Sequence, residues 1–149
     1  MKSDLPTVIV FPSFMKLPHY SIGLKTMPRK FDTGATRDDE TGKYDYEGAI
    51  DPAVLHAFAG YMHEHRYMPD GTIRSADNWQ KGIPSESYMS SLVRHVMDLW
   101  RLHRYGIAVR PETNETVDIT EALGGIFFNV QGLWRSYLIE QAVMQKEEQ

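Results

Sequence analysis

The 149-residue chain contains no cysteine. Without thiols it has no disulfides, no thiolate metal site and no cysteine nucleophile. This composition is compatible with a reducing compartment such as the cytoplasm, where disulfides are rare.

The N-terminal part of the chain also has no long apolar run. The longest, residues 8–11, is stopped by Pro12, which makes it too short for the apolar core of a signal peptide or for a membrane span. We therefore expect a cytoplasmic protein without a membrane partner.

Positive charge is not in excess. The formal net charge is -4, which argues against a nucleic-acid partner bound by phosphate neutralisation. A small anionic ligand remains possible, because a binding site depends on local charge rather than on the total.

Two familiar catalytic patterns are missing as well. The sequence contains no glycine-rich phosphate loop of the P-loop type and no nucleophile elbow.

The composition is that of one globular domain, with 42% apolar and 11% aromatic residues. We expect residues 1–28 to form an N-terminal arm with one possible short strand at 7–11. Residues 29–149 would form the main domain, beginning with a long polar loop over 29–48.

Apolar periodicity and capping residues predict three long helices in the main domain. The first should run from Pro52 to about residue 66, with Asp51 as its N-cap. The second should run from the cap Ser85 to about residue 105, closed by Gly106. The third should begin near residues 116–118 and end near residue 145. These elements predict a mainly α fold, a helical bundle of three to four helices with an extended N-terminal arm.

The second and third helices carry polar residues on their apolar sides. His95 lies between leucines on the core-facing stripe, and Asp98 lies at the edge of the same side. If the two helices are antiparallel neighbours, these residues face Glu121 and Asn129 on the small-residue face of the last helix. Such a set could hold Mg²⁺ between helices of a bundle. Glycines at 124, 125 and 132 predict a close approach to this helix.

The preceding loops carry cations and an aromatic residue suited to an anionic, flat ligand. Lys43 precedes the first helix, Lys81 precedes the second, and Arg94 lies within the second. These cations could contact phosphate, and Trp79 could stack on a base.

Each candidate also has a structural interpretation. His95 and Asp98 could be a hydrogen-bonded pair in the core, and Asn129 could belong to a buried polar network. Glu121 could complete a capping box that begins at Asp118. Trp79 could simply cover the hydrophobic core.

Several of these segments occur in an order that resembles a phage protein family, the dATP/dGTP diphosphohydrolase N-terminal domains. The resemblance covers about residues 29–140. Its motifs are Arg29-Lys30-Phe31-Asp32-Thr33-Gly34-Ala35-Thr36-Arg37-Asp38, Gly42-Lys43-Tyr44-Asp45-Tyr46-Glu47-Gly48, Asp77-Asn78-Trp79-Gln80-Lys81-Gly82-Ile83-Pro84, Arg94-His95-Val96-Met97-Asp98, and Glu121-Ala122-Leu123 with Phe128-Asn129.

The resemblance implies a helical domain related to MazG-like nucleotide pyrophosphohydrolases, which act in phage nucleotide metabolism in the host cytoplasm. These enzymes use divalent cations held by two carboxylate pairs to split a nucleoside triphosphate into monophosphate and pyrophosphate. The first pair would correspond to His95 and Asp98. The second would correspond to Glu121 and Gly124, where the last carboxylate is missing, or to the out-of-phase Asp118 and Glu121.

The family therefore implies a Mg²⁺- or Mn²⁺-dependent hydrolase of a purine (deoxy)nucleoside triphosphate. In it Asp98 and Glu121 are metal ligands and His95 is catalytic. Lys43, Lys81 and Arg94 contact phosphate, Trp79 contacts the base, and Asn129 also lies in the substrate site. By analogy with related helical hydrolases, we expect a homo-oligomer.

Two other functional classes remain open. The first is a catalytically silent protein that binds or sequesters a nucleotide or a host protein, which the incomplete carboxylate set favours. The second is an interaction module in which His95 and Asn129 only stabilise the core.

Overall fold

The computed structural model describes residues 28–37 and 43–147. The chain divides into two compact units, residues 1–50 and residues 51–149. The possible strand at 7–11 lies outside the described residues.

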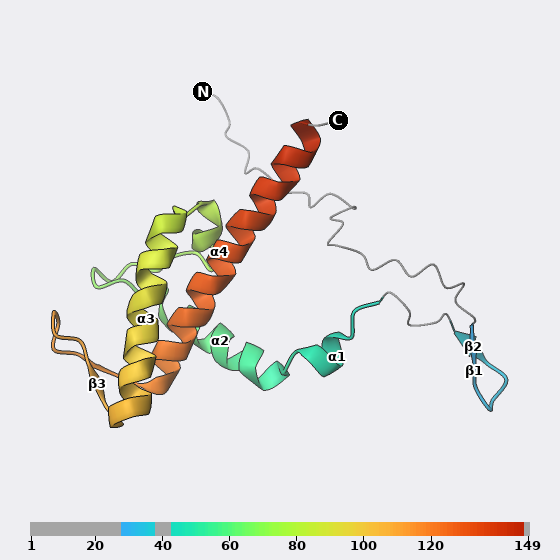
Figure 1. Cartoon of the computed structure of the whole chain (residues 1–149), viewed down its shortest axis with the longest axis horizontal. Helices are drawn as coiled ribbons and strands as arrows, with labels where there is room; N and C mark the ends of the chain where they lie inside the picture. The colour runs from blue at the N-terminus through green and yellow to red at the C-terminus, as the bar shows by residue number, and fades with distance from the viewer. Residues whose placement is uncertain (1–27, 38–42, 148–149) are drawn as a thin grey trace. The chain divides into compact units, whose positions relative to one another are not determined.

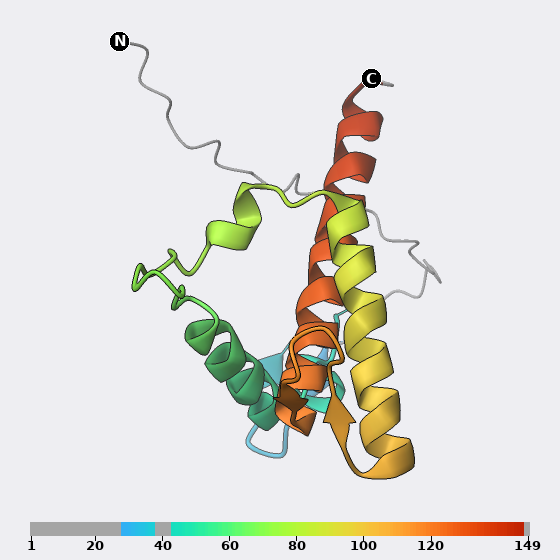
Figure 2. The same ribbon diagram turned by 90° about the vertical axis from the view of Figure 1, so that its left-hand side faces the viewer.

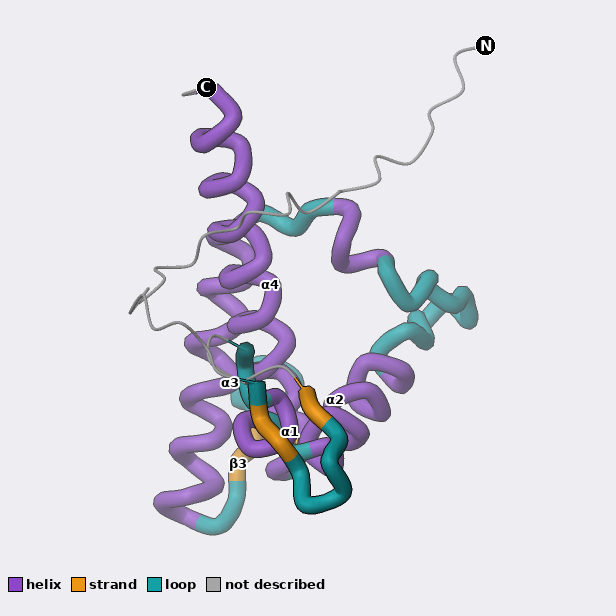
Figure 3. Tube along the Cα trace, turned by 90° about the vertical axis from the view of Figure 1, so that its right-hand side faces the viewer, coloured by secondary structure: helices purple, strands orange, loops and turns teal. Residues whose placement is uncertain are grey.

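The first unit contains short elements where the sequence predicted only a loop. Strands β1 (Arg29–Lys30) and β2 (Thr36–Arg37) pair in an antiparallel hairpin, drawn in orange in Figure 3. Helix α1 (Tyr46–Ala49) follows. Its N-terminus is capped by the Asp45 side chain, which accepts a hydrogen bond of 2.9 Å from the Gly48 amide. The loop prediction for 29–48 is therefore wrong at these elements, which are too short to show a period.

The second unit begins with α2 (Pro52–Glu64), as the sequence predicted. The Asp51 carboxylate accepts a hydrogen bond of 2.7 Å from the Ala53 amide, and proline occupies the first helical position. After α2 the chain turns through Gly71 (φ 83°) and enters the short 3₁₀ helix η1 (Asn78–Lys81). Figure 2 shows this segment arching from α2 to the next helix.

Helix α3 spans Ser85–Tyr105. Ser85 is its first helical residue rather than its cap, because Pro84 holds the cap position with extended backbone angles and makes no side-chain cap bond. The predicted end is confirmed. Gly106 adopts a left-handed conformation (φ 72°), and its amide donates to the Leu102 carbonyl at 2.9 Å.

The connection between the two long helices is a β-hairpin that the sequence did not predict. Strand β3 (Ala108–Val109) pairs antiparallel with β4 (Thr116–Val117), and the turn between them contains Asn114 at φ 59°. Thr116 and Val117 are therefore strand residues, and the last helix begins after them.

Helix α4 spans Ile119–Glu147. The Asp118 carboxylate accepts a hydrogen bond of 2.8 Å from the Glu121 amide, which confirms its N-cap role. Figures 1 and 2 show α3 and α4 side by side and antiparallel, with α4 extending past the start of α3.

The glycines of α4 receive aromatic rings from the neighbouring helices, as their spacing predicted. The Tyr61 ring lies against Gly124, the His95 ring against Gly125, and the Tyr88 ring against Gly132. A methyl group at any of the three positions would overlap the ring. The helices therefore approach closely at these points.

Few hydrophobic side chains in the described residues are fully buried. Ala108, Val117 and Ala122 form a small cluster, with Leu99 and Leu102 packed against it. The cluster lies where the β3–β4 hairpin covers the base of α3 and α4. The mainly α fold, with four helices among the described residues, is confirmed.

Candidate functional site

Asp98 is the most deeply buried charged residue of the described chain, with 2% of its surface exposed. Its carboxylate accepts a hydrogen bond from Nε of Arg110 at 3.0 Å and forms an ion pair with Nη2 of the same residue, also at 3.0 Å. Arg101, three residues further along α3, approaches the second oxygen at 3.5 Å. The prediction that Asp98 lies at the edge of its helix side is wrong, because two guanidinium groups compensate the charge and let it enter the interior.

Arg110 reaches this position from the β3–β4 hairpin. Its amide donates to the Glu115 carbonyl at 2.9 Å, which holds the base of the hairpin turn. Its guanidinium also lies 3.7 Å from a Glu121 carboxylate oxygen. One cation therefore joins an acid on α3 to an acid on α4.

Glu121 continues this network to α2. Its other oxygen lies 3.2 Å from Nε2 of His65. The Nδ1 atom of His65 lies 2.9 Å from the Tyr61 carbonyl oxygen, so the ring is oriented from both sides. Within the described part of the chain, the partners of the Glu121 side chain are therefore Arg110 and His65, which lie outside α4, and not the Asp118 residue of the predicted capping box.

His95 lies beside these charges and is half-buried. Its Nδ1 atom is buried and has no hydrogen-bond partner among the described residues. Burial lowers the pKa of the imidazole, and the positive charge of Arg110 lowers it further, whereas Glu121 and Asp98 act in the opposite direction. The ring is therefore held in its neutral form near neutral pH.

Tyr61 connects the charged network to a cavity. Its ring is tilted by 33° against the His65 ring, with 4.0 Å between ring centroids, and lies against Gly124. Burial, followed by the nearby negative charge of Glu121, raises the pKa of the Tyr61 hydroxyl to about 12. The hydroxyl therefore keeps its proton near neutral pH.

A cavity of about 170 Å³ lies between α2, η1 and α4. Tyr61, Trp79 and Phe128 supply aromatic surface. The guanidinium-bearing Arg66 and Arg74 and the imidazole of His65 also line the cavity. The remaining lining residues are Met62, Ser75, Ala76, Asn78 and Ile83.

Trp79 is half-buried in η1, on this cavity. It meets Phe128 edge to face, with 6.4 Å between centroids, and the Arg135 guanidinium lies 5.5 Å from its ring. The 3₁₀ helix η1 places the indole of Trp79 against Phe128 of α4 and on the cavity wall. Trp79 therefore covers apolar surface and also lines a possible binding site.

The remaining predicted site residues lie elsewhere. Asn129 is buried and donates to the Gly125 carbonyl one turn earlier in α4 at 2.7 Å. Lys81 approaches Asn78 Oδ1 at 3.3 Å, and Arg94 is exposed and donates to Ser91 at 2.8 Å. Lys43 is an exposed residue of the first unit. Of these four residues, none lines the cavity.

Three residues that matter in this arrangement were missed from the sequence. Arg110 gave no signal, because its role depends on a hairpin formed by short strands. His65 follows α2 directly, one turn after Tyr61, which places it on the apolar side of that helix. Arg74 lies in the loop between α2 and η1, where no periodicity marks it as a cavity residue.

The two predicted metal ligands are paired with a cation of the chain itself. Within 28–37 and 43–147, no group of three or more His, Asp or Glu residues is placed to hold a metal ion. Asp98 and Glu121 share the Arg110 guanidinium, which already supplies the positive charge between them. A magnesium site at these residues therefore stays a prediction.

Compared with protein-family models, with curated proteins and with solved structures, the chain matches none of them. No helix in the described part of the chain is long and apolar enough to cross a membrane. Function is therefore argued from the geometry of the cavity and its neighbouring charges.

Proposed function

We propose that the chain binds a purine (deoxy)nucleoside triphosphate at the cavity beside Trp79. The observation that carries this proposal is the lining of the cavity, in which Trp79 and Phe128 lie close to Arg66 and Arg74. A nucleotide presents a flat base and a chain of phosphates, and it needs both kinds of surface.

The size of the cavity favours binding of the base rather than of the whole ligand. Its volume of about 170 Å³ is below the ~300–1,000 Å³ common for complete small-molecule sites. The base would lie against the rings, and the phosphates would extend toward the exposed Arg74. The neutral Tyr61 hydroxyl is a hydrogen-bond donor in the same wall.

The paired state of the acids favours binding without turnover. Asp98 and Glu121 are both engaged by Arg110, and Glu121 also by His65. A protein that sequesters a nucleotide needs only the cavity. We therefore place metal-independent binding first.

Hydrolysis to a monophosphate and pyrophosphate, with Mg²⁺ or Mn²⁺, is the second candidate function. The observation that favours it is that one guanidinium reaches both Asp98 and Glu121, so a single cation can serve both carboxylates. In this candidate Arg110 has to leave the two acids before a metal ion can bind.

A thermal-shift panel of deoxynucleotides and ribonucleotides, with Mg²⁺ or with a chelator, tests both candidates when pyrophosphate release is followed in the same samples. A ligand at a hundredfold its dissociation constant adds about 2.7 kcal/mol of stability. We expect stabilisation by purine triphosphates in the presence of the chelator. Absence of a shift with every nucleotide would refute the binding proposal.

Two tryptophan variants locate the site. Trp79→Ala should remove the nucleotide-dependent shift, because base stacking contributes about 1–3 kcal/mol. Trp100→Ala is the matched control, since Trp100 is exposed on α3 and does not line the cavity. An equal loss in both variants would place the ligand elsewhere.

Two acid variants test the hydrolase. If Mg²⁺-dependent pyrophosphate release is found, Asp98→Asn and Glu121→Gln should abolish it. Full activity in both variants would show that these acids do not carry the reaction.

A further inference from the structure

The exposed side of α4 carries a regular apolar pattern that stays largely uncovered in the single chain. Of its rings, Phe127 alone contacts another ring within the described residues, Phe58 of α2 at 4.4 Å between centroids, and it still remains 42% exposed. Large side chains recur at alternating spacings of four and three residues over 123–137, and the same register continues to position 144. They are Leu123, Phe127, Val130, Trp134, Tyr137 and Met144, here called the α4 seam. Alternation of three and four is the repeat of a helix that packs along its length against another helix.

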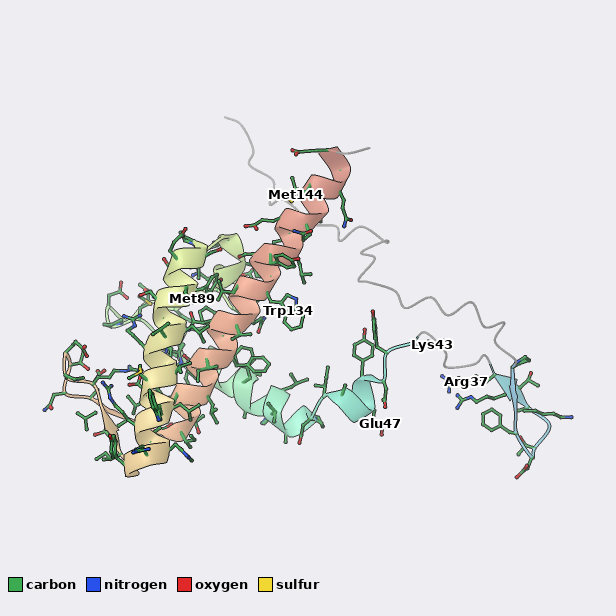
Figure 4. The ribbon with its side chains drawn as sticks, in the orientation of Figure 1. Arg37, Lys43, Glu47, Met89, Trp134 and Met144 are labelled. Carbon is green, nitrogen blue, oxygen red and sulfur yellow. The ribbon has the colours of Figure 1, made fainter. Side chains whose placement is uncertain are left out.

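The intrachain contacts of α4 with α3 lie on a different side of the helix. His95 and Tyr88 of α3 lie against Gly125 and Gly132, which are offset from the seam positions. The seam side chains remain between 42% and 64% exposed, with Trp134 the highest. Figure 4 shows Trp134 on the side of α4 away from α3, and Met144 on the part of α4 that extends past α3.

The area of the seam matches the requirement of a dimer. From Leu123 to Met144 the helix rises about 32 Å. With half of each side chain exposed, the six residues present on the order of 600 Å² per chain, or ~1,200 Å² when two seams meet. Specific interfaces begin at about this size, whereas a monomer rarely leaves so long an apolar strip exposed.

The chemistry of the seam favours a second copy of the same chain as the occupant. In an isologous interface the same surface of both subunits meets, so a charged residue near the two-fold axis would lie close to its identical copy and be repelled by it. None of the six seam residues is charged, and the position in register between Tyr137 and Met144 is the neutral Gln141. A single polar residue in such a repeat helps to fix the register of two helices.

We infer that the α4 seam is a homodimer interface, with Trp134 near its centre. A large, half-exposed aromatic residue in the middle of an apolar strip is the usual type of energetic anchor in an interface. The inference does not depend on nucleotide binding, because none of the seam residues lines the cavity.

The first test is the mass of the full chain in solution by sedimentation equilibrium. We expect twice the chain mass of 17.1 kDa. Trp134→Glu should give a folded monomer, because a dimer would bury two unpaired carboxylates. Lys146→Glu is the matched control. It introduces the same residue at an exposed position of α4 outside the seam register and should leave the dimer intact. A monomeric wild-type chain at high micromolar concentration, or a dimeric Trp134→Glu protein, would overturn the inference.

A second measurement covers the case in which Trp134→Glu fails to fold. Because the chain has no cysteine, single thiols can be introduced by Val130→Cys and Val93→Cys and spin-labelled. Val93 is also exposed, at 54% against 42% for Val130, but lies on α3. We expect a shorter distance between labels at 130 than between labels at 93. The reverse order would assign the interface to α3, and absence of dipolar coupling at both positions would show that no dimer forms.

Discussion

Replacing Arg110 with methionine would measure how strongly the β3–β4 hairpin holds α3 through Asp98. The substitution leaves a carboxylate that is 2% exposed facing an apolar side chain. Removal of one partner from a buried ion pair costs about 3–5 kcal/mol. Arg101 remains at 3.5 Å and the Arg110 side chain is itself 27% exposed, so we expect a smaller loss, about 2–3 kcal/mol.

The assay is urea denaturation of the full chain followed by circular dichroism, in which the midpoint should fall at an unchanged slope. Arg104→Met is the control, because Arg104 is exposed near the end of α3 and has no ion pair within the described residues. Its loss should stay below ~1 kcal/mol.

A double-mutant cycle separates the ion pair from general packing. Asp98→Asn removes the buried charge, so Arg110→Met should be less damaging in that background, with a coupling energy of at least ~1 kcal/mol. The reasoning is refuted if the two effects add, or if Arg110→Met is no more destabilising than Arg104→Met.

Two further predictions concern α4 and its neighbours. Gly132→Ala should destabilise the chain by about 1–3 kcal/mol, because the new methyl overlaps the Tyr88 ring. Gly60→Ala, which meets open space in α2, should stabilise it by about 0.5–1 kcal/mol, and equal effects in urea titrations would contradict the packing described. The folded-state pKa of His95 lies below its ordinary value of 6.5. The unfolded chain therefore binds the proton more readily, and stability should fall as the pH drops through 6.5 toward the folded-state pKa. His95→Gln should flatten this part of the pH profile relative to the wild type, and an unchanged profile would exclude His95 as its source.

The helices were predictable because the signals that start and end them are local in the sequence. Asp51 with Pro52 starts α2, and Gly106 ends α3, because capping depends on residues that are adjacent in sequence. The close contacts of α4 were also predictable, since mid-helix glycines are costly unless a neighbour approaches there. The predicted cap of α3 was wrong by one residue, at Pro84.

The site was less predictable, because its contacts join distant parts of the chain. Asp98 lies three residues after His95 and four before Leu102, which places it on the buried side, but its charge argued for the edge. Its burial depends on Arg110, whose position depends on a hairpin of two-residue strands. Periodicity cannot detect strands of that length.

Two ring-to-glycine contacts between α3 and α4 fix the position of one helix along the axis of the other. Tyr88 and His95 are seven residues apart, and so are their receiving glycines, Gly132 and Gly125, which run in the opposite direction. If α4 slid by two turns, one of the two rings would face the glycine that now receives the other ring. The second ring would then face a residue that has a side chain. Helix alignment is therefore specified within the helices themselves. The turn at 111–115 is consequently a place where the chain can gain residues while α3 and α4 keep their alignment.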